Sequence, residues 1–154
     1  MVLDELDKAI VRELQSDARK SNRDVAAAVG VSPTTALDRT RALRTRGVIR
    51  GAILDVDLGT IGRPVQALIA VRVRPPSRKV IDSFRQWVLA LPDILGMFVT
   101  TGNEDFILHV AVPDNKALYE FVIDKLTQRP ELADVRTSMV YEHITNVRIS
   151  PVDR

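Results

Sequence analysis

The sequence predicts an α+β fold with two domains, an N-terminal helix-turn-helix domain and a C-terminal ferredoxin-like βαββαβ domain. The first fifty residues contain three short helical patterns, and the third is rich in arginine. The rest of the chain reads as strand, helix, strand, strand, helix, strand, which is the ferredoxin-like order. A length of 154 residues with 45% hydrophobic content is enough for two small domains.

The first predicted helix follows Asp4, a residue type that caps helices, and Asp7 places an acid in its first turn. Leu6, Ile10 and Leu14 recur at intervals of four residues, so they form one apolar stripe. One face of this helix is therefore expected to be buried.

Two further helices follow in quick succession. The second begins at Ser21 within a capping box and ends at Gly30. The third is capped by Ser32 and is expected to run to about Arg46, because Gly47 then ends it.

The third helix has two distinct faces, since successive helical residues turn by about 100°. Ala36, Thr40 and Leu43 fall together and are expected to pack on the other helices. The opposite face is expected to read DNA, because such a helix enters the major groove with its N-terminal residues against the bases. The predicted base-reading residues are Ser32, Thr34, Thr35, Asp38 and Arg41. The flanking arginines expected to bind phosphates are Arg39, Arg44, Arg46 and Arg50.

Side-chain chemistry fits this assignment but also allows another. Arg41 can donate two hydrogen bonds to guanine, and Asp38 can accept one from cytosine. Alternatively, Asp38 pairs with Arg41 on the same helix and the arginines form an ordinary solvated surface. Charge distribution favours DNA. Residues 1–50 hold ten Lys or Arg against seven Asp or Glu, and residues 39–50 hold five arginines and no acid.

Residues 51–64 mix glycine and proline with short apolar pieces, which predicts a strand-bearing linker. Strands are expected at residues 65–73, 95–101, 106–112 and 135–144, and the turn at residues 102–105 makes the middle two a hairpin. Ser77 and Asp114 are expected to open the two helices of this domain. Their predicted buried residues are Ile81, Phe84, Val88 and Leu91 in the first, and Leu118, Phe121, Val122 and Leu126 in the second.

The second face of this sheet is predicted to be too apolar for a domain that works alone. If Phe106, Leu108 and Val110 face the helices, the residues in between face outward, together with others of the first strand. The expected outward set is Ile107, His109, Ala111, Leu68 and Ala70. Such a face favours self-association. An error of one residue in a strand would reverse its two faces.

Other classes of function lack their residues. The chain has no cysteine, its two histidines (His109 and His143) stand in no metal-ligand or nucleophile–base spacing, and no phosphate-binding glycine loop occurs. We therefore expect no enzymatic activity, no metal site and no cofactor. There is also no long apolar run for export or membrane insertion, so a cytoplasmic location is expected.

Taken in order, several segments resemble the Lrp/AsnC family of feast/famine transcriptional regulators. They are Leu3 to Asp7 with Ile10 and Leu14, Val29 to Thr34, Leu37 to Arg39, Arg41 to Leu43, Gly47 to Gly51, and the pair Gly102 and Asp105. The resemblance implies a winged-helix-like DNA-binding domain at residues 1–50, a linker at 51–64, an effector and assembly (RAM) domain at 65–144 and a C-terminal tail at 145–154. It further implies double-stranded DNA as a partner, a nucleoid-associated location, dimers that assemble into tetramers or octamers, and amino acids bound between subunits.

The resemblance also implies an effector site at the hairpin. Glycine there frees backbone N–H groups for a carboxylate, while Glu104 or Asp105 offers charge to an ammonium group. The expected effector-binding residues are Thr100, Thr101, Gly102, Asn103, Glu104, Asp105, Thr137 and Ser138. An ordinary turn with a polar tip is the alternative. The chain departs from the usual family pattern at Thr40 (usually Val or Ile), Arg44 (usually an acid) and Asn103 (often Asp).

The sequence thus predicts a sequence-specific transcriptional regulator that responds to an amino acid. The alternative is an architectural DNA-packing protein, or a ligand-sensing assembly module, with little sequence preference.

Overall fold

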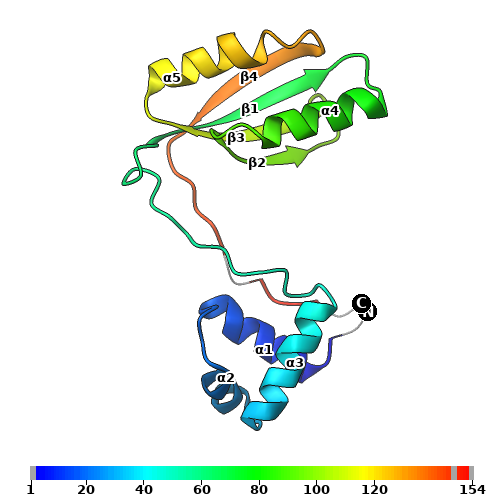
Figure 1. The fold of residues 1–154 in the computed structure, drawn as a ribbon, viewed down its shortest axis with the longest axis vertical. Coiled ribbons are helices and arrows are strands. Elements are labelled where there is room, and N and C mark those ends of the chain that lie inside the picture. The colour runs from blue at the N-terminus through cyan, green and yellow to red at the C-terminus, as the bar shows by residue number, and fades with distance from the viewer. Residues whose placement is uncertain (1–2, 147–148, 153–154) are drawn as a thin grey trace. The chain divides into compact units, whose positions relative to one another are not determined.

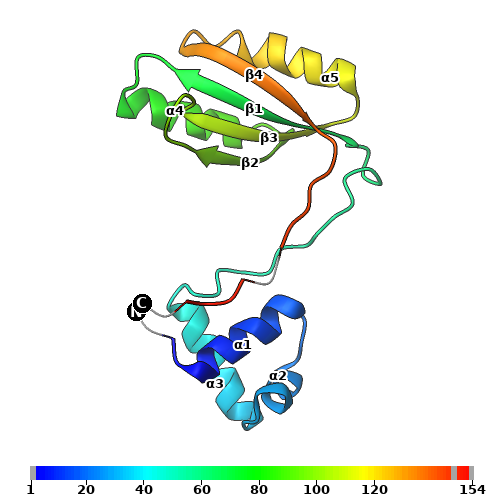
Figure 2. The same ribbon diagram turned by 180° about the vertical axis from the view of Figure 1, so that it is seen from behind.

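A computed structural model describes residues 3–146 and 149–152. Its chain forms two compact units, one of residues 1–55 with 144–154 and one of residues 56–143 (Figures 1 and 2). Of the tail predicted over residues 145–154, residues 147, 148, 153 and 154 lie outside the described part.

The first unit contains three helices, α1 (Glu5–Ser16), α2 (Asn22–Val29) and α3 (Pro33–Thr45). Their beginnings and ends confirm the sequence prediction. The side chains of Asp4, Ser21 and Ser32 each accept a hydrogen bond from a backbone N–H of the first turn. Gly30 and Gly47 follow α2 and α3 with φ of 72° and 73°, a conformation that costs glycine little. The small core comprises Ile10, Val25, Ala26, Ala36 and Leu43.

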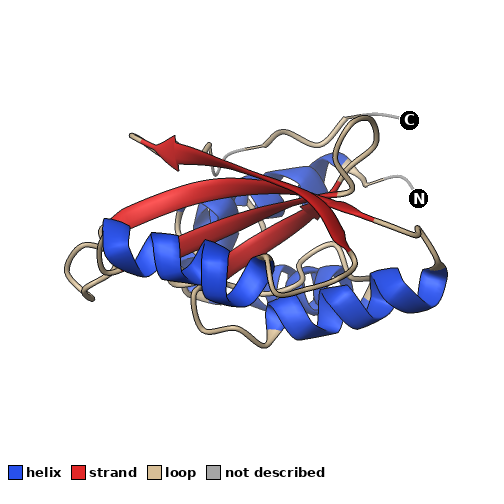
Figure 3. Ribbon diagram, turned by 90° about the horizontal axis from the view of Figure 1, so that it is seen from above, coloured by secondary structure: helices blue, strands red, loops and turns tan. Residues whose placement is uncertain are grey.

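The second unit is an antiparallel sheet covered on one face by helices (Figure 3). Its strands are β1 (Val65–Val73), β2 (Ile94–Val99), β3 (Phe106–Val112) and β4 (Leu132–Val140), in the spatial order β2-β3-β1-β4. The covering helices are α4 (Arg78–Leu89) and α5 (Asn115–Glu120), and α5 continues as the π-helical turn η1 (Phe121–Leu126). The predicted ferredoxin-like order is confirmed.

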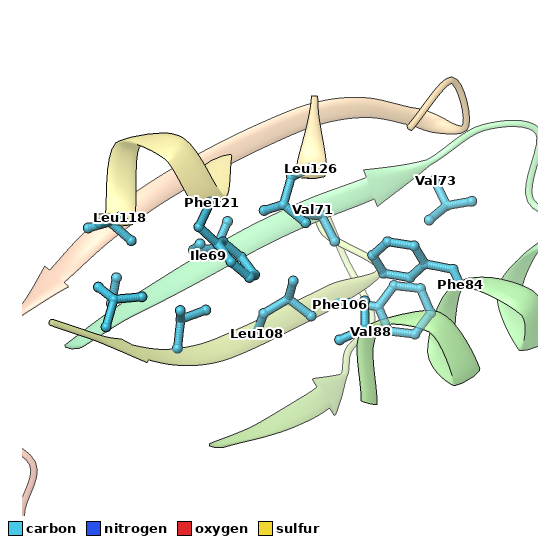
Figure 4. Close-up of a cluster of buried hydrophobic side chains, with 13 residues drawn as sticks. Ile69, Val71, Val73, Phe84, Val88, Phe106, Leu108, Leu118, Phe121 and Leu126 are labelled. Atoms are coloured by element: carbon cyan, nitrogen blue, oxygen red, sulfur yellow. The ribbon is translucent and has the colours of Figure 1, made fainter. Parts of the chain in front are cut away.

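The core of this unit lies between the sheet and the helices (Figure 4). Phe84 of α4 is fully buried, and its ring lies 5.2 Å from the ring of Phe106 on β3. Leu118, Phe121 and Leu126 cover the other half of the sheet. Each fully buried large apolar side chain contributes about 1.5–3 kcal/mol relative to exposure, so these residues hold helices and sheet together.

Three expectations about strands need correction. The last strand was expected at residues 135–144, but β4 begins at Leu132 and ends at Val140, because Gln66, next to the start of β1, is the last residue that pairs with it. Strand β2 similarly ends at Val99 rather than at residue 101. No strand is found within residues 51–64, all of which are described, since no neighbouring strand of this single chain offers them ladder hydrogen bonds.

Candidate functional site

The helix α3 presents one buried face and one exposed face, as its sequence predicts. Ala36, Thr40 and Leu43 are buried against α1 and α2. The hydroxyl of Thr40 is buried without a hydrogen-bond partner among the described residues. A valine, which the family resemblance leads one to expect here, would fill the same space without a polar atom.

The five residues predicted to read bases are all exposed, but they differ in how free they are. The Ser32 hydroxyl accepts the Thr35 N–H at 3.1 Å and lies 2.8 Å from the Thr35 hydroxyl, so these two side chains also cap α3. Thr34, Asp38 and Arg41 make no side-chain hydrogen bond or ion pair with the rest of residues 3–146 and 149–152. The alternative pairing of Asp38 with Arg41 is therefore not formed.

The four flanking arginines fall into two classes. Arg39 donates to Asp4 at 2.6 Å and to Asp7 at 3.3 Å, and Arg46 donates to Asp7 at 3.0 Å. Arg44 and Arg50, in contrast, have no acidic partner in the described part of the chain. Arg39 and Arg46 were expected at phosphates, and the structure instead engages their guanidinium groups with carboxylates of the α1 N-terminus.

The contact between Asp4 and Arg39 also shifts the pKa values of both groups. The Asp7 N–H and the Arg39 guanidinium, in that order of importance, lower the pKa of Asp4, and Asp4 in turn raises the pKa of Arg39. Both groups therefore stay charged at neutral pH, and the α1–α3 contact is ionic.

The predicted effector hairpin joins β2 to β3. Thr100 closes the loop, since its N–H donates to the Asp105 carbonyl at 3.0 Å and its hydroxyl donates to the Glu104 carbonyl at 2.9 Å. Gly102 has a φ of 111°, which a side chain would strain. The hairpin was predicted correctly from these residues.

Three arginines that the sequence reading missed surround this hairpin. Arg72 donates to the Asn103 carbonyl at 2.6 Å, Arg74 lies 3.3 Å from the Asp105 carboxylate, and Arg136 forms an ion pair with Glu104. Because these partners lie about thirty residues away in sequence, only the strand register reveals them.

The Asp105 carboxylate also has a structural task, since it accepts the Val73 N–H at 2.7 Å at the end of β1. Of the two candidate acids, Glu104 is thus the one not bonded to the backbone in the described part of the chain.

The structure separates the two predicted effector residues of β4. Thr137 is opposite the fully buried Ile69, and Ser138 is opposite Leu68. Opposite residues share a face of the sheet, so Thr137 belongs to the helix-covered face and Ser138 to the open face. Only Ser138 therefore shares a face with outward residues of the sheet.

The open face of the sheet is apolar over much of its area. Leu68, Ala70 and Ile107 lie on it as predicted, and Phe98, opposite Ile107, adds a large ring that is 60% exposed. Ala111 was expected to be outward too, but it is fully buried, and the Arg63 side chain lies against it, donating to its carbonyl at 2.7 Å.

The two histidines meet on this open face. His109 lies 2.9 Å from the Gln66 amide oxygen, and its ring contacts that of His143 edge to face at 5.2 Å. Burial, and to a lesser extent His143, lower the pKa of His109. The two rings pack against each other, and no cluster of three metal-binding side chains occurs among the described residues.

A hollow of about 330 Å³ lies beside α5 and η1, and Asp93 is one of its lining residues. Asp93 accepts hydrogen bonds from Arg63 at 2.9 Å and from Lys125 at 2.8 Å. Burial alone would raise the pKa of Asp93, but the bonds from Lys125 and Arg63 outweigh it and the pKa is lowered. This network ties the segment before β1 to η1 and accounts for the charges at the hollow.

No helix in residues 3–146 or 149–152 is both long enough and apolar enough to cross a membrane.

Sequence and structure comparisons place these sites in a known context. Residues 3–44 match the AsnC-type helix-turn-helix domain, and residues 66–148 match the Lrp/AsnC ligand binding domain. The chain is 38% identical to the HTH-type transcriptional regulator AldR of Mycobacterium tuberculosis, over 92% of this chain and 79% of the relative. It is 34% identical to the transcriptional regulator AzlB of Bacillus subtilis, over 99% and 98%. Among solved structures, a transcriptional regulator of Neisseria meningitidis in complex with L-Met superposes with a TM-score of 0.87 at 28% identity, covering 94% of each chain.

Proposed function

The chain belongs to the Lrp/AsnC family and is a DNA-binding transcriptional regulator, and on that premise we propose that it reads a specific DNA site as a dimer or larger assembly and responds to an amino acid. The matched relatives are regulators and not enzymes. We place its action on the nucleoid, in the cytoplasm.

The observation that carries the proposal is the exposed face of α3. Thr34, Asp38 and Arg41 project from a helix whose other face is locked in the core, and none of them is engaged within the described chain. Side chains at the start of a recognition helix are those that reach base edges. Arg41 is assigned to a guanine, Asp38 to a cytosine, and Arg44 and Arg50 to phosphates.

The open face of the sheet supports a dimer. Leu68, Phe98 and Ile107 form an apolar surface on the sheet domain. A second copy of this surface would cover it and would also supply a second recognition helix, as half-sites one helical turn apart require. Larger assemblies, tetramers or octamers, are proposed by analogy with the family.

The hairpin supports an amino-acid effector between subunits. The N–H groups of Gly102 and Asn103 donate no hydrogen bond within the described chain and suit a carboxylate, and Glu104 suits an ammonium group. The relative from Neisseria meningitidis was solved with L-Met. The proposed site consists of Thr100, Thr101, Gly102, Asn103, Glu104 and Ser138, with Asp105 holding the hairpin in place, while Thr137 lies on the other face of the sheet.

The effector is proposed to act on assembly. A ligand bound between sheet domains can shift the equilibrium between two assemblies only by binding one of them more tightly. The favoured assembly then sets the spacing of paired recognition helices, and hence the DNA affinity.

The first test is a titration of DNA from upstream of the protein's own gene against unrelated DNA, at several salt concentrations. Preferential binding to the upstream DNA supports the regulator. Equal, steeply salt-dependent binding to both supports an architectural DNA-packing protein instead.

The effector is tested by repeating the titration with each of the twenty amino acids and following assembly by sedimentation velocity. One amino acid should change both assembly and affinity, and Glu104→Gln should weaken its effect. A protein whose assembly and affinity ignore all twenty contradicts the effector part of the proposal and leaves the DNA part intact.

A further inference from the structure

The contact between the start of α1 and the recognition helix α3 is built around one buried carboxylate. The Asp7 side chain is only 4% exposed, and its two oxygens take separate partners, Oδ1 from Arg39 and Oδ2 from Arg46. Burying a carboxylate costs free energy unless it is paired, and the two arginines supply that pairing for Asp7.

The two arginines grip α3 at two levels. They are seven residues apart, which places them on nearly the same side of the helix and about 10 Å apart along its axis. A single contact would allow α3 to rotate about it, whereas two contacts to one carboxylate fix both rotation and height. Asp4 adds a third contact, since it accepts from Arg39 at 2.6 Å while it caps α1.

The same contacts remove two positive charges from the basic segment. Of the five arginines at residues 39–50, Arg39 and Arg46 have acidic partners, and Arg41, Arg44 and Arg50 have none within the described chain. An arginine held by carboxylates on one side of its helix is less available to a phosphate.

From this geometry we propose that Asp7 is a positioning residue for DNA reading. It sets the orientation of α3 through Arg39 and Arg46, and it keeps these two arginines out of the phosphate contacts. The inference rests on the proposed function, in which α3 reads bases.

The test compares two arginines of the same turn, Arg46→Gln and the matched control Arg44→Gln. A DNA duplex selected by the full-length protein from a random pool and a scrambled duplex of the same composition are each titrated at five KCl concentrations. Arg44→Gln should weaken binding to both duplexes and reduce the slope of log K against log salt by about 0.9 per phosphate contact, with the preference ratio unchanged.

Arg46→Gln should do the opposite. Its salt slope should stay at the wild-type value, and its preference for the selected duplex should fall about tenfold, a loss of the size that one mismatched base pair causes. Arg46→Lys, which keeps the charge at this position, should recover part of the preference. A positioning role is overturned if Arg46→Gln lowers the salt slope as Arg44→Gln does. It is also overturned if Arg46→Gln lowers the melting temperature of the protein and weakens binding to both duplexes equally, so that the preference ratio does not change.

Asp7→Asn provides the second arm. It keeps the shape of the side chain and frees the arginines, so the slope should become steeper while the preference falls. If this variant does not fold by circular dichroism, Arg39→Gln takes its place with the expectation given for Arg46→Gln. A wild-type protein that enriches no sequence from the pool would overturn the proposed function itself, and the two failures are thus distinguishable.

Discussion

At the scale of single residues, Thr40 is the clearest mismatch between a side chain and its surroundings. Its hydroxyl is buried without a partner in the described chain, and a buried group of this kind costs about 1–3 kcal/mol. Thr40→Val should therefore raise the local stability of α3 by about 1 kcal/mol, which is about fivefold slower hydrogen exchange in its peptides.

The control for this prediction is Thr45→Val, which changes an exposed threonine of the same helix. Its exchange rate should hardly change. If Thr40→Val speeds exchange, the hydroxyl has a partner that stabilises the helix and the prediction is wrong.

The pH dependence of stability follows from His109. Because its pKa is lowered on folding, mainly by burial, the folded protein binds this proton less readily than the unfolded chain, whose histidines titrate near 6.5. The stabilising contribution is complete above pH 6.5 and is lost as the pH falls below it. Unfolding by denaturant should thus require less denaturant at pH 5 than at pH 7.5.

Two variants separate His109 from other acid effects. His109→Gln should flatten the pH dependence of stability. His143→Gln should raise the pKa of His109 only part of the way back toward 6.5, since burial is the larger cause of the lowered pKa. An unchanged pH profile in His109→Gln would assign the acid sensitivity elsewhere.

At the scale of elements, the hairpin between β2 and β3 is predicted to depend on Asp105. Its carboxylate accepts the N–H of the fully buried Val73, so Asp105→Ala leaves that group unsatisfied. We expect a loss of about 1–3 kcal/mol and faster exchange of the Val73 amide. Glu104→Gln, which removes only an ion pair with Arg136, is the control and should leave that amide protected.

Most elements could be predicted because their signals are local. Asp4, Ser21, Ser32, Ser77 and Asp114 each cap the helix expected of them, and β1 and β3 have the predicted bounds. The bounds of β4 depend on how far β1 extends, and the fate of residues 51–64 depends on whether a partner strand exists. Both depend on which strands pair with each other, and a local sequence pattern does not contain that information.

The candidate sites follow the same division. The faces of α3 follow from helical periodicity, so the sequence alone placed Thr34, Asp38 and Arg41 on the exposed face, while their role at the bases stays a prediction. The ion pairs of Asp7 with Arg39 and Arg46 join residues more than thirty positions apart in the sequence. The contacts that Arg72 and Arg136 make with the hairpin do the same. Such contacts appear only when the chain is folded.

At the scale of the whole molecule, the open sheet face leads to a prediction about assembly. Ile107→Glu places a charge in the middle of the apolar surface, and burying it against a second copy would leave it unpaired. We expect a monomer in sedimentation velocity, with weaker DNA binding because two recognition helices no longer act together.

The matched control is Tyr119→Glu, which adds the same charge at an exposed residue of α5, on the helix side of the sheet. It should assemble like the wild type. If Ile107→Glu assembles normally and Tyr119→Glu does not, the copies meet through their helices.

The pairing of Arg39 and Arg46 with Asp7 also bears on how such a protein finds its site. A chromosome offers a vast excess of wrong sequences, and the time spent on each grows with the number of free cations that hold the phosphates. If α3 reads DNA as proposed, the internal pairing of two of the five arginines shortens each stop on a wrong sequence. The ion pairs with Asp7 then favour fast dissociation from wrong sequences, and the base contacts decide where the protein stays bound.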